Sequence, residues 1–238
     1  MIFFIKLLLA HIVGDFILQP NSWVHEKTRK KIRSKRVYLH ALIHGALAFL
    51  FIWDLQFLLP AIIIMSSHLI IDISRQYISY GKALHAFIVD QLLHLAVIAG
   101  ISFWWLDINP LSSISFGETA MLYLTAFLIV SFPAAILVKL SIARWFPYDD
   151  LSEDQSLNKA GRFIGMLERL FVLIFVLAGR WEGIGFLIAA KSIFRFSDLK
   201  ENANHKLTEY FLIGTLLSIG IALITGLLVL YIQTTGLH

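Results

Sequence analysis

The sequence contains no cysteine, and it is poor in charge. The missing cysteine excludes disulfides, thiolate metal sites and a cysteine nucleophile, so any metal must bind His, Asp or Glu. Charged residues make up 15% of the 238 positions and hydrophobic residues 58%, whereas soluble chains have about 25% charged and about 45–50% apolar residues. With a mean hydropathy of +0.76, the chain is neither an ordinary soluble domain nor a disordered one.

Long apolar stretches run through the whole sequence, separated by short polar segments. A stretch of about 20 apolar residues is long enough to cross a bilayer as a helix. We therefore predict an all-α, polytopic integral membrane bundle of about eight transmembrane helices. The predicted spans are 2–18, 38–52, 57–73, 84–105, 118–140, 163–178, 184–196 and 207–232. The sixth and seventh are short, and a re-entrant hairpin is the alternative for them.

The distribution of Lys and Arg over the connections predicts the orientation in the membrane. The odd-numbered connections hold 16 Lys and Arg residues, and the even-numbered ones hold Arg180 alone. Because cytoplasmic connections carry the excess of Lys and Arg, we expect the odd connections to be cytoplasmic and both termini to lie outside. The most basic segment, Lys27–Arg36, holds 7 of these cations, and we expect it to contact anionic lipid headgroups rather than nucleic acid.

The histidines concentrate in the first half of the chain. A polar segment near the middle separates residues 1–146, with predicted helices one to five, from residues 147–238, with predicted helices six to eight. Seven of the nine His residues lie in the first half. We therefore expect a His-rich and Asp-rich membrane half that carries the functional site, followed by a second membrane half.

Four predicted helices of the first half each carry a pair of polar residues four positions apart. The pairs are His11 and Asp15, His40 and His44, His68 and Asp72, and Asp90 and His94. On a helix such residues share one face, with Cβ atoms about 5–6 Å apart, so both side chains can reach one ion. At about 1.5 Å rise per residue, the predicted topology puts all of them in the cytoplasmic half of the bilayer. The sequence therefore predicts one buried polar site that opens to the cytoplasm.

The chemistry of these residues favours a divalent metal. Three carboxylates in an apolar setting are costly unless a cation compensates them, and neutral imidazoles are good metal ligands. The predicted ligands are His11, Asp15, His40, His44, His68, Asp72, Asp90 and His94. They suffice for one or two ions, with zinc as the expected metal and manganese or iron as alternatives. A proton or ion pathway and a purely hydrogen-bonded cluster remain the other interpretations.

Further charged residues flank or follow this site. Arg36, Arg75 and Lys82 are expected at the cytoplasmic entrance, where they can attract an anionic group. In the second half, Glu168, Lys191 and Arg195 lie within predicted helices. They predict either an ion-paired cluster that joins these helices or a site that binds an anionic headgroup. We treat all six as candidate substrate-binding residues.

The pairs also resemble a known family. The stretches His11-x-x-Gly-Asp15 with Gln19-Pro20, His40-Ala-Leu-Ile-His44-Gly45, His68-x-x-x-Asp72 and Asp90-Gln-x-x-His94 are similar to those of the bacterial membrane family called domain of unknown function 3307. The stretches Gly165–Arg169 and Ala189–Phe196 resemble its C-terminal half. This resemblance implies a multi-pass protein of the bacterial inner membrane. The His-rich half also resembles, more distantly, predicted membrane-bound metal-dependent hydrolases and the signature of zinc-dependent phospholipases C.

The function that these observations favour is metal-dependent hydrolysis at the cytoplasmic side. A bound ion lowers the pKa of water and polarises a carbonyl or phosphoryl group, and Asp15, Asp72 and Asp90 are the candidate ligands or general bases. The depth of the site indicates a lipid, a lipid-linked metabolite or a membrane-embedded peptide as substrate. A metal or proton transporter is the alternative, and a metal-binding scaffold or regulator is a second one. No oligomeric state is predicted.

Overall fold

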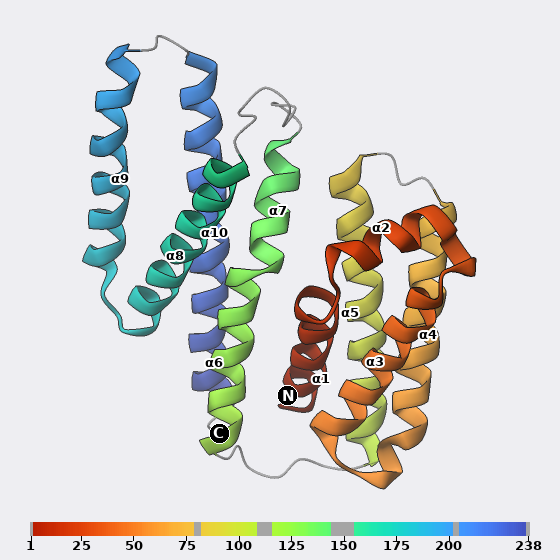
Figure 1. Cartoon of the computed structure of the whole chain (residues 1–238). Helices are drawn as coiled ribbons and strands as arrows, with labels where there is room; N and C mark the ends of the chain where they lie inside the picture. Colours follow the sequence, from red (N-terminus) through yellow and green to blue (C-terminus); the bar gives the residue numbers. More distant parts are fainter. Residues whose placement is uncertain (1, 79–81, 109–115, 144–154, 202–204, 237–238) are drawn as a thin grey trace. The chain divides into compact units, whose positions relative to one another are not determined.

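The computed structural model describes residues 2–78, 82–108, 116–143, 155–201 and 205–236. They are helical almost throughout, in agreement with the all-α prediction (Figure 1). Contacts divide the chain into two compact units, one up to Thr125 and one from Ala126 to Gly236. The predicted domain boundary between 146 and 147 lies outside the described residues.

The first unit contains a short helix that packs against longer ones. Helix α1 spans Ile2–Ile12, and its Phe3, Leu7 and His11 are buried. It packs against α3 (Lys35–Ile52) and α5 (Ala83–Ile108), while α4 (Leu58–Tyr77) packs against both α3 and α5. Helices α3 and α5 thus cover one side of α1, so that its His11 faces protein rather than lipid (Figure 1).

The end of α1 is irregular, and the irregularity positions the site. The turn Val13–Ile17 is a π-helix, with the Leu18 amide donating to the Val13 carbonyl at 2.9 Å. Pro20, which cannot continue a helix, then starts α2 (Asn21–Lys30). The chain bends by 82° here, so α2 lies across one end of the other helices (Figure 1). The segment predicted as a basic loop is therefore a helix followed by the short 3-10 turn Lys31–Arg33.

An apolar cluster fills the opposite end of the first unit. Phe3, Phe57 and Trp105 contact one another, with ring centroids 5.2–5.8 Å apart. Leu7, Ile64 and Ile98 extend this cluster toward the middle of the helices. The outer surfaces are apolar as well, because Leu42, Ile70 and Leu92, among others, are exposed. An apolar exterior around buried polar groups is the pattern of a membrane bundle.

The second unit contains α7 (Pro133–Ile142), α8 (Gln155–Leu177), α9 (Trp181–Glu201) and α10 (His205–Gly236). Helix α10 packs against α7 and α8, and α9 packs against α8. Helix α6 (Phe116–Ser131) precedes α7 and is broken from it at Phe132. Within α8, Arg169 is buried, and its Nε donates to the Val130 carbonyl beside this break. The guanidinium thus satisfies a backbone group next to Pro133, whose ring interrupts helical hydrogen bonding.

The described helices support a multi-pass membrane protein with five to six candidate spans, and the predicted count of eight stays a prediction. Five are long and apolar enough to cross a bilayer, or six if α1 and α2 form one bent span. The five are Lys35–Ile52, Leu55–Tyr77, Ala83–Trp105, Gly117–Ile142 and Leu212–Thr235. Within the described part of the chain, α8 and α9 are not among them, and their spans stay predictions.

Candidate metal centre

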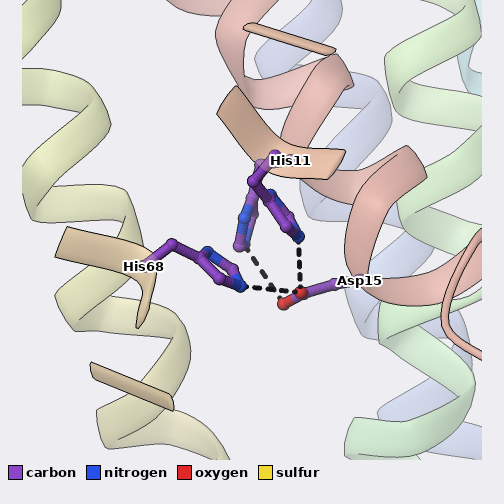
Figure 2. A group of neighbouring side chains, drawn as sticks. His11, Asp15 and His68 are labelled. Atoms are coloured by element: carbon purple, nitrogen blue, oxygen red, sulfur yellow. Dashed lines mark hydrogen bonds and ion pairs between the residues drawn. The ribbon is translucent and has the colours of Figure 1, made fainter. Parts of the chain in front are cut away.

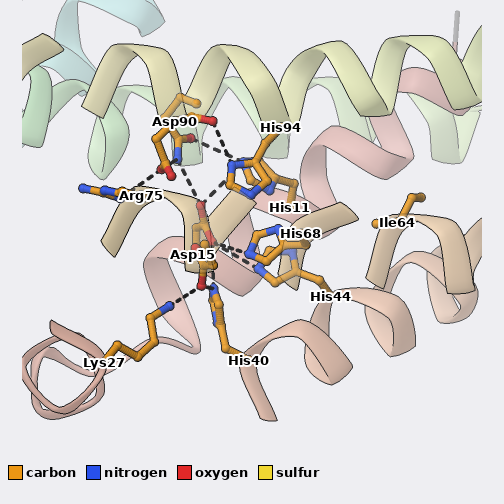
Figure 3. Close-up of polar contacts among 12 residues, drawn as sticks. His11, Asp15, Lys27, His40, His44, Ile64, His68, Arg75, Asp90 and His94 are labelled. Carbon is orange, nitrogen blue, oxygen red and sulfur yellow. Dashed lines mark hydrogen bonds and ion pairs between the residues drawn. The ribbon is translucent and has the colours of Figure 1, made fainter. Parts of the chain in front are cut away.

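The polar pairs of the first unit converge between the helices, as their spacing predicts. All five histidines of these pairs are buried, and so are Asp72 and Asp90. The rings of His44 and His68 stack with centroids 3.6 Å apart, and those of His68 and His94 lie 4.1 Å apart. Figure 3 shows the labelled side chains as one group, with Lys27 and Arg75 on one side and Ile64 on the other.

Asp15 is the centre of this group. Its Oδ1 lies 3.1 Å from Nε2 of His40, 3.1 Å from Nε2 of His44 and 3.6 Å from Nε2 of His68. Its Oδ2 lies 3.6 Å from Nε2 of His11. Figure 2 shows His11 and His68 directed at this carboxylate from different helices. One carboxylate of the π-turn is therefore shared by imidazoles from three helices.

Gly14 makes this arrangement sterically possible. A Cβ atom at this position would lie 2.5 Å from Cε1 and Nε2 of His44, well inside ordinary contact distance. The backbone of the π-turn therefore lies directly against the His44 ring. π-helical turns occur often at functional sites, and here the turn carries Asp15 next to the histidines of α3.

Two sets of side chains have the geometry to hold a metal ion. We call His11, Asp15, His44 and His68 the primary cluster, and His40, His68 and Asp72 the secondary cluster. Within each cluster, one ligand atom from every residue lies within 4.8 Å of the others. Six of the eight predicted ligands therefore belong to these clusters, which share His68.

The other two predicted ligands, Asp90 and His94, lie beside the clusters. His94 Nδ1 is 2.9 Å from the carbonyl oxygen of Asp90, which can only accept, so this nitrogen carries the proton. Nε2 of His94 is buried without a hydrogen-bond partner among the described residues, and it is the atom of this ring that could bind a metal. A hydrogen bond from one ring nitrogen to a carbonyl oxygen commonly fixes the other nitrogen as the one that binds metal.

A small cavity adjoins the histidines. It has a volume of about 20 Å³, enough for one water-sized occupant, and His11, His44, His68 and His94 line one part of it. The rest of the lining is mainly apolar and includes Leu7, Ala48, Ile64 and Ile98. One side of the cavity is therefore formed by imidazoles and the other side by apolar side chains.

The three carboxylates differ in their positive partners. Asp72 pairs with Lys27 at 2.5 Å, and Asp90 pairs with Arg75 at 2.9 Å. Among the described residues, the ion pairs of Asp15 are with histidines only. Since neutral imidazoles provide no positive charge, the Asp15 carboxylate is the one whose charge a bound cation would have to compensate. The donor set of the primary cluster therefore fits a divalent ion.

The residues predicted to bind substrate lie in varied settings. Arg75 is occupied by Asp90, and Arg36 lies over the ring of Trp23 at 5.0 Å. Lys82 is exposed just before α5. In the second unit Lys191 pairs with Glu168 at 2.6 Å. The side chain of Arg195 lies outside the described part of the chain. For all of them, substrate binding stays a prediction.

Two site residues were missed by the sequence reasoning. Gln91 donates to Oδ2 of Asp15 at 3.0 Å and to Oδ2 of Asp90 at 3.2 Å, so it connects two of the carboxylates. It follows Asp90 directly and is about 100° away around the helix, so a four-residue spacing does not find it. Lys27 was counted with the basic segment. The signal that could have singled it out is its spacing of four residues from Trp23, which places both residues on one face of a helix.

Comparison with known proteins agrees with the resemblance in the sequence. The family model described as protein of unknown function (DUF3307) matches residues 3–138, more than half of the chain. The chain therefore belongs to this family, and the match covers all eight paired residues. No curated protein and no solved structure matches the chain. The resemblance to metal-dependent hydrolases thus stays a prediction.

Proposed function

We propose that this member of the DUF3307 family is a metal-dependent hydrolase embedded in the bacterial inner membrane. One observation carries the proposal: the primary cluster combines three buried imidazoles with a carboxylate that has no Lys or Arg partner among the described residues. Three His and one carboxylate suit zinc, with manganese or iron as alternatives.

Each residue of the site has a proposed task. His11, His44, His68 and Asp15 hold the ion, while His40 and Gln91 fix the Asp15 carboxylate by contacts of 3.1 and 3.0 Å. A divalent ion at such a site supplies Lewis acidity, which activates water and polarises the bond to be cleaved. Asp72 and Asp90 are the proposed proton acceptors, because neither belongs to the primary cluster and both are buried next to it.

The surroundings support a substrate with an apolar part. The side chains next to the histidines include Leu7, Ile64 and Ile98, so the site borders on apolar surface, while the cavity itself has room for one water-sized occupant. The cluster of Phe3, Phe57 and Trp105 lies further along the same helices. A transport pathway needs polar groups toward both membrane faces, and this apolar end favours a closed pocket instead. A lipid or lipid-linked substrate is therefore the proposed class.

The orientation is proposed from the Lys and Arg distribution. The segment 27–36 faces the cytoplasm, and both termini lie outside, which requires α8 and α9 to cross the membrane and gives eight spans. Helix α2 would then lie at the cytoplasmic surface, at 82° to α1. Its exposed Arg29 and Lys30 would contact anionic headgroups next to the site.

The first test measures bound metal. Wild-type protein, purified in detergent without chelators, should contain zinc by elemental analysis. His44→Ala and His68→Ala should each lose most of it, because a remnant of the cluster binds a divalent ion much more weakly. His25→Ala is the matched control, since His25 is exposed on α2. Wild-type protein without metal, or variants with full metal content, would contradict the proposal.

The second test measures hydrolysis. The probes are p-nitrophenyl butyrate, bis(p-nitrophenyl) phosphate and vesicles of phosphatidylethanolamine with phosphatidylglycerol, the last followed by mass spectrometry of the lipids. Asp72→Asn should keep the metal and lower turnover by about 10²–10⁴-fold if Asp72 accepts the proton. If Asp72 instead binds the ion, metal content should fall as well; thermal stability should fall in either case, because the variant leaves the buried Lys27 ammonium without its carboxylate.

A further inference from the structure

Lys27 is an unusual residue, because a lysine of the basic helix α2 is buried. Its exposed fraction is 7%, whereas its neighbours Arg29 and Lys30 are exposed. The bend of 82° after Pro20 directs this one side chain of α2 into the first unit. There Nζ reaches Oδ2 of Asp72, 45 residues further along the chain. A buried ammonium is costly unless a carboxylate compensates it, so the two charges depend on each other.

Asp72 is also a member of the secondary cluster. Oδ2, the oxygen that accepts from Lys27, lies 3.9 Å from Nε2 of His40. His40 is completely buried, and its Nδ1 has no hydrogen-bond partner among the described residues, nor has Nε2 of His68. Two imidazoles and a carboxylate, each with a ligand atom within 4.8 Å of the others, form the donor set of a divalent cation site.

An ammonium group and a divalent ion cannot both occupy this position. A zinc ion binds a carboxylate oxygen at about 2.0–2.2 Å, and Lys27 Nζ is 2.5 Å from that same oxygen. The two cations would compete for the lone pairs of Asp72. They would also repel each other strongly, because they would lie close together in a protein interior of low dielectric constant. Asp15 of the primary cluster has no such tethered cation among the described residues.

We propose that the Lys27 ammonium is a tethered cation that takes the place of a second divalent ion in the secondary cluster. The chain then binds one ion, in the primary cluster, and supplies the second positive charge itself. This inference rests on the proposed function, since it assumes that the primary cluster holds metal. Lys27 also stabilises the position of α2 next to the site, because its ion pair with Asp72 connects α2 to α4.

The test counts ions per chain after dialysis against excess zinc, by elemental analysis of protein in detergent. The wild type should bind one ion. Lys27→Met, which keeps the length of the side chain and removes the charge, should bind two. Because the secondary cluster shares His68 with the primary one, the second ion should be the weaker, and dialysis against metal-free buffer should remove it first.

Three variants serve as controls. Lys27→Arg keeps the charge and should bind one ion. The double variant Lys27→Met with Asp72→Asn removes both charges of the pair, so it leaves no buried charge uncompensated, and it should also bind one ion. Lys30→Met changes an exposed lysine of the same helix, paired with Glu26 at 3.3 Å, and should not alter the count.

The outcomes separate this inference from the proposed function. One ion in both the wild type and Lys27→Met would overturn the tethered cation and leave the metal-dependent hydrolase standing. Two ions in the wild type would also overturn it, because Lys27 would then not keep a second ion out of the secondary cluster. This result comes from the wild type alone, so it does not depend on whether a variant folds. A wild type without any ion would contradict the proposed function itself.

Discussion

Gly14→Ala is the most specific perturbation of the metal centre that the structure offers. The new Cβ would lie 2.5 Å from Cε1 and Nε2 of His44 and 3.0 Å from Nδ1. Ordinary contacts between such atoms are about 3.5–4.0 Å, so the ring or the π-turn must move by about 1 Å. The ring cannot move freely, because it stacks on His68 with centroids 3.6 Å apart.

The displacement should affect stability and metal binding together. Overpacking of this kind costs about 1–3 kcal/mol, which thermal unfolding in detergent should detect. The contact of 3.1 Å between His44 Nε2 and Asp15 Oδ1 would lengthen by up to about the same 1 Å. Metal ligands tolerate errors of only about 0.2 Å, so we expect most of the bound zinc to be lost.

Gly100→Ala is the matched control for this prediction. It makes the same chemical change on α5 of the same unit, and a Cβ there would meet nothing within 4 Å. Because Ala is a better helix former than Gly by about 1 kcal/mol, this variant should be as stable as the wild type or more so, with full zinc content. If Gly14→Ala behaves like Gly100→Ala in both measurements, the close contact with His44 does not exist as described.

Three further predictions concern other parts of the chain. Gln91→Leu removes the hydrogen bond to Asp15, and zinc affinity, measured by competition with a chelator, should fall about 10–100-fold, as is typical for a residue that orients a ligand. Arg169→Met leaves a buried carbonyl without its donor, so thermal unfolding should show a loss of about 1–3 kcal/mol with unchanged zinc content. In this cysteine-free chain, a cysteine at exposed Lys30 should react with impermeant reagents only from the cytoplasmic side, and one at exposed Trp53 only from outside; the reverse pattern would invert the topology.

The residues that meet at the site could be predicted from the sequence. Polar side chains on apolar helices must face protein rather than lipid, and a spacing of four puts both members of a pair on one face. These two rules suffice to bring His40, His44, His68 and His94 together. They do not predict the π-turn, which brings Gly14 against the His44 ring of a different helix.

The partner of each carboxylate was decided by the tertiary structure alone. The sequence places Lys27 among 7 cations of a basic segment, and it does not show which of these cations is paired with a distant carboxylate. Only the bend after Pro20 and the position of α2 over the end of α4 carry its ammonium to Asp72. Helical periodicity fixes which side chains share a face, because it acts over a few residues. An ion pair across 45 residues depends on how whole helices pack, so the charge balance of the site becomes visible only in the folded chain.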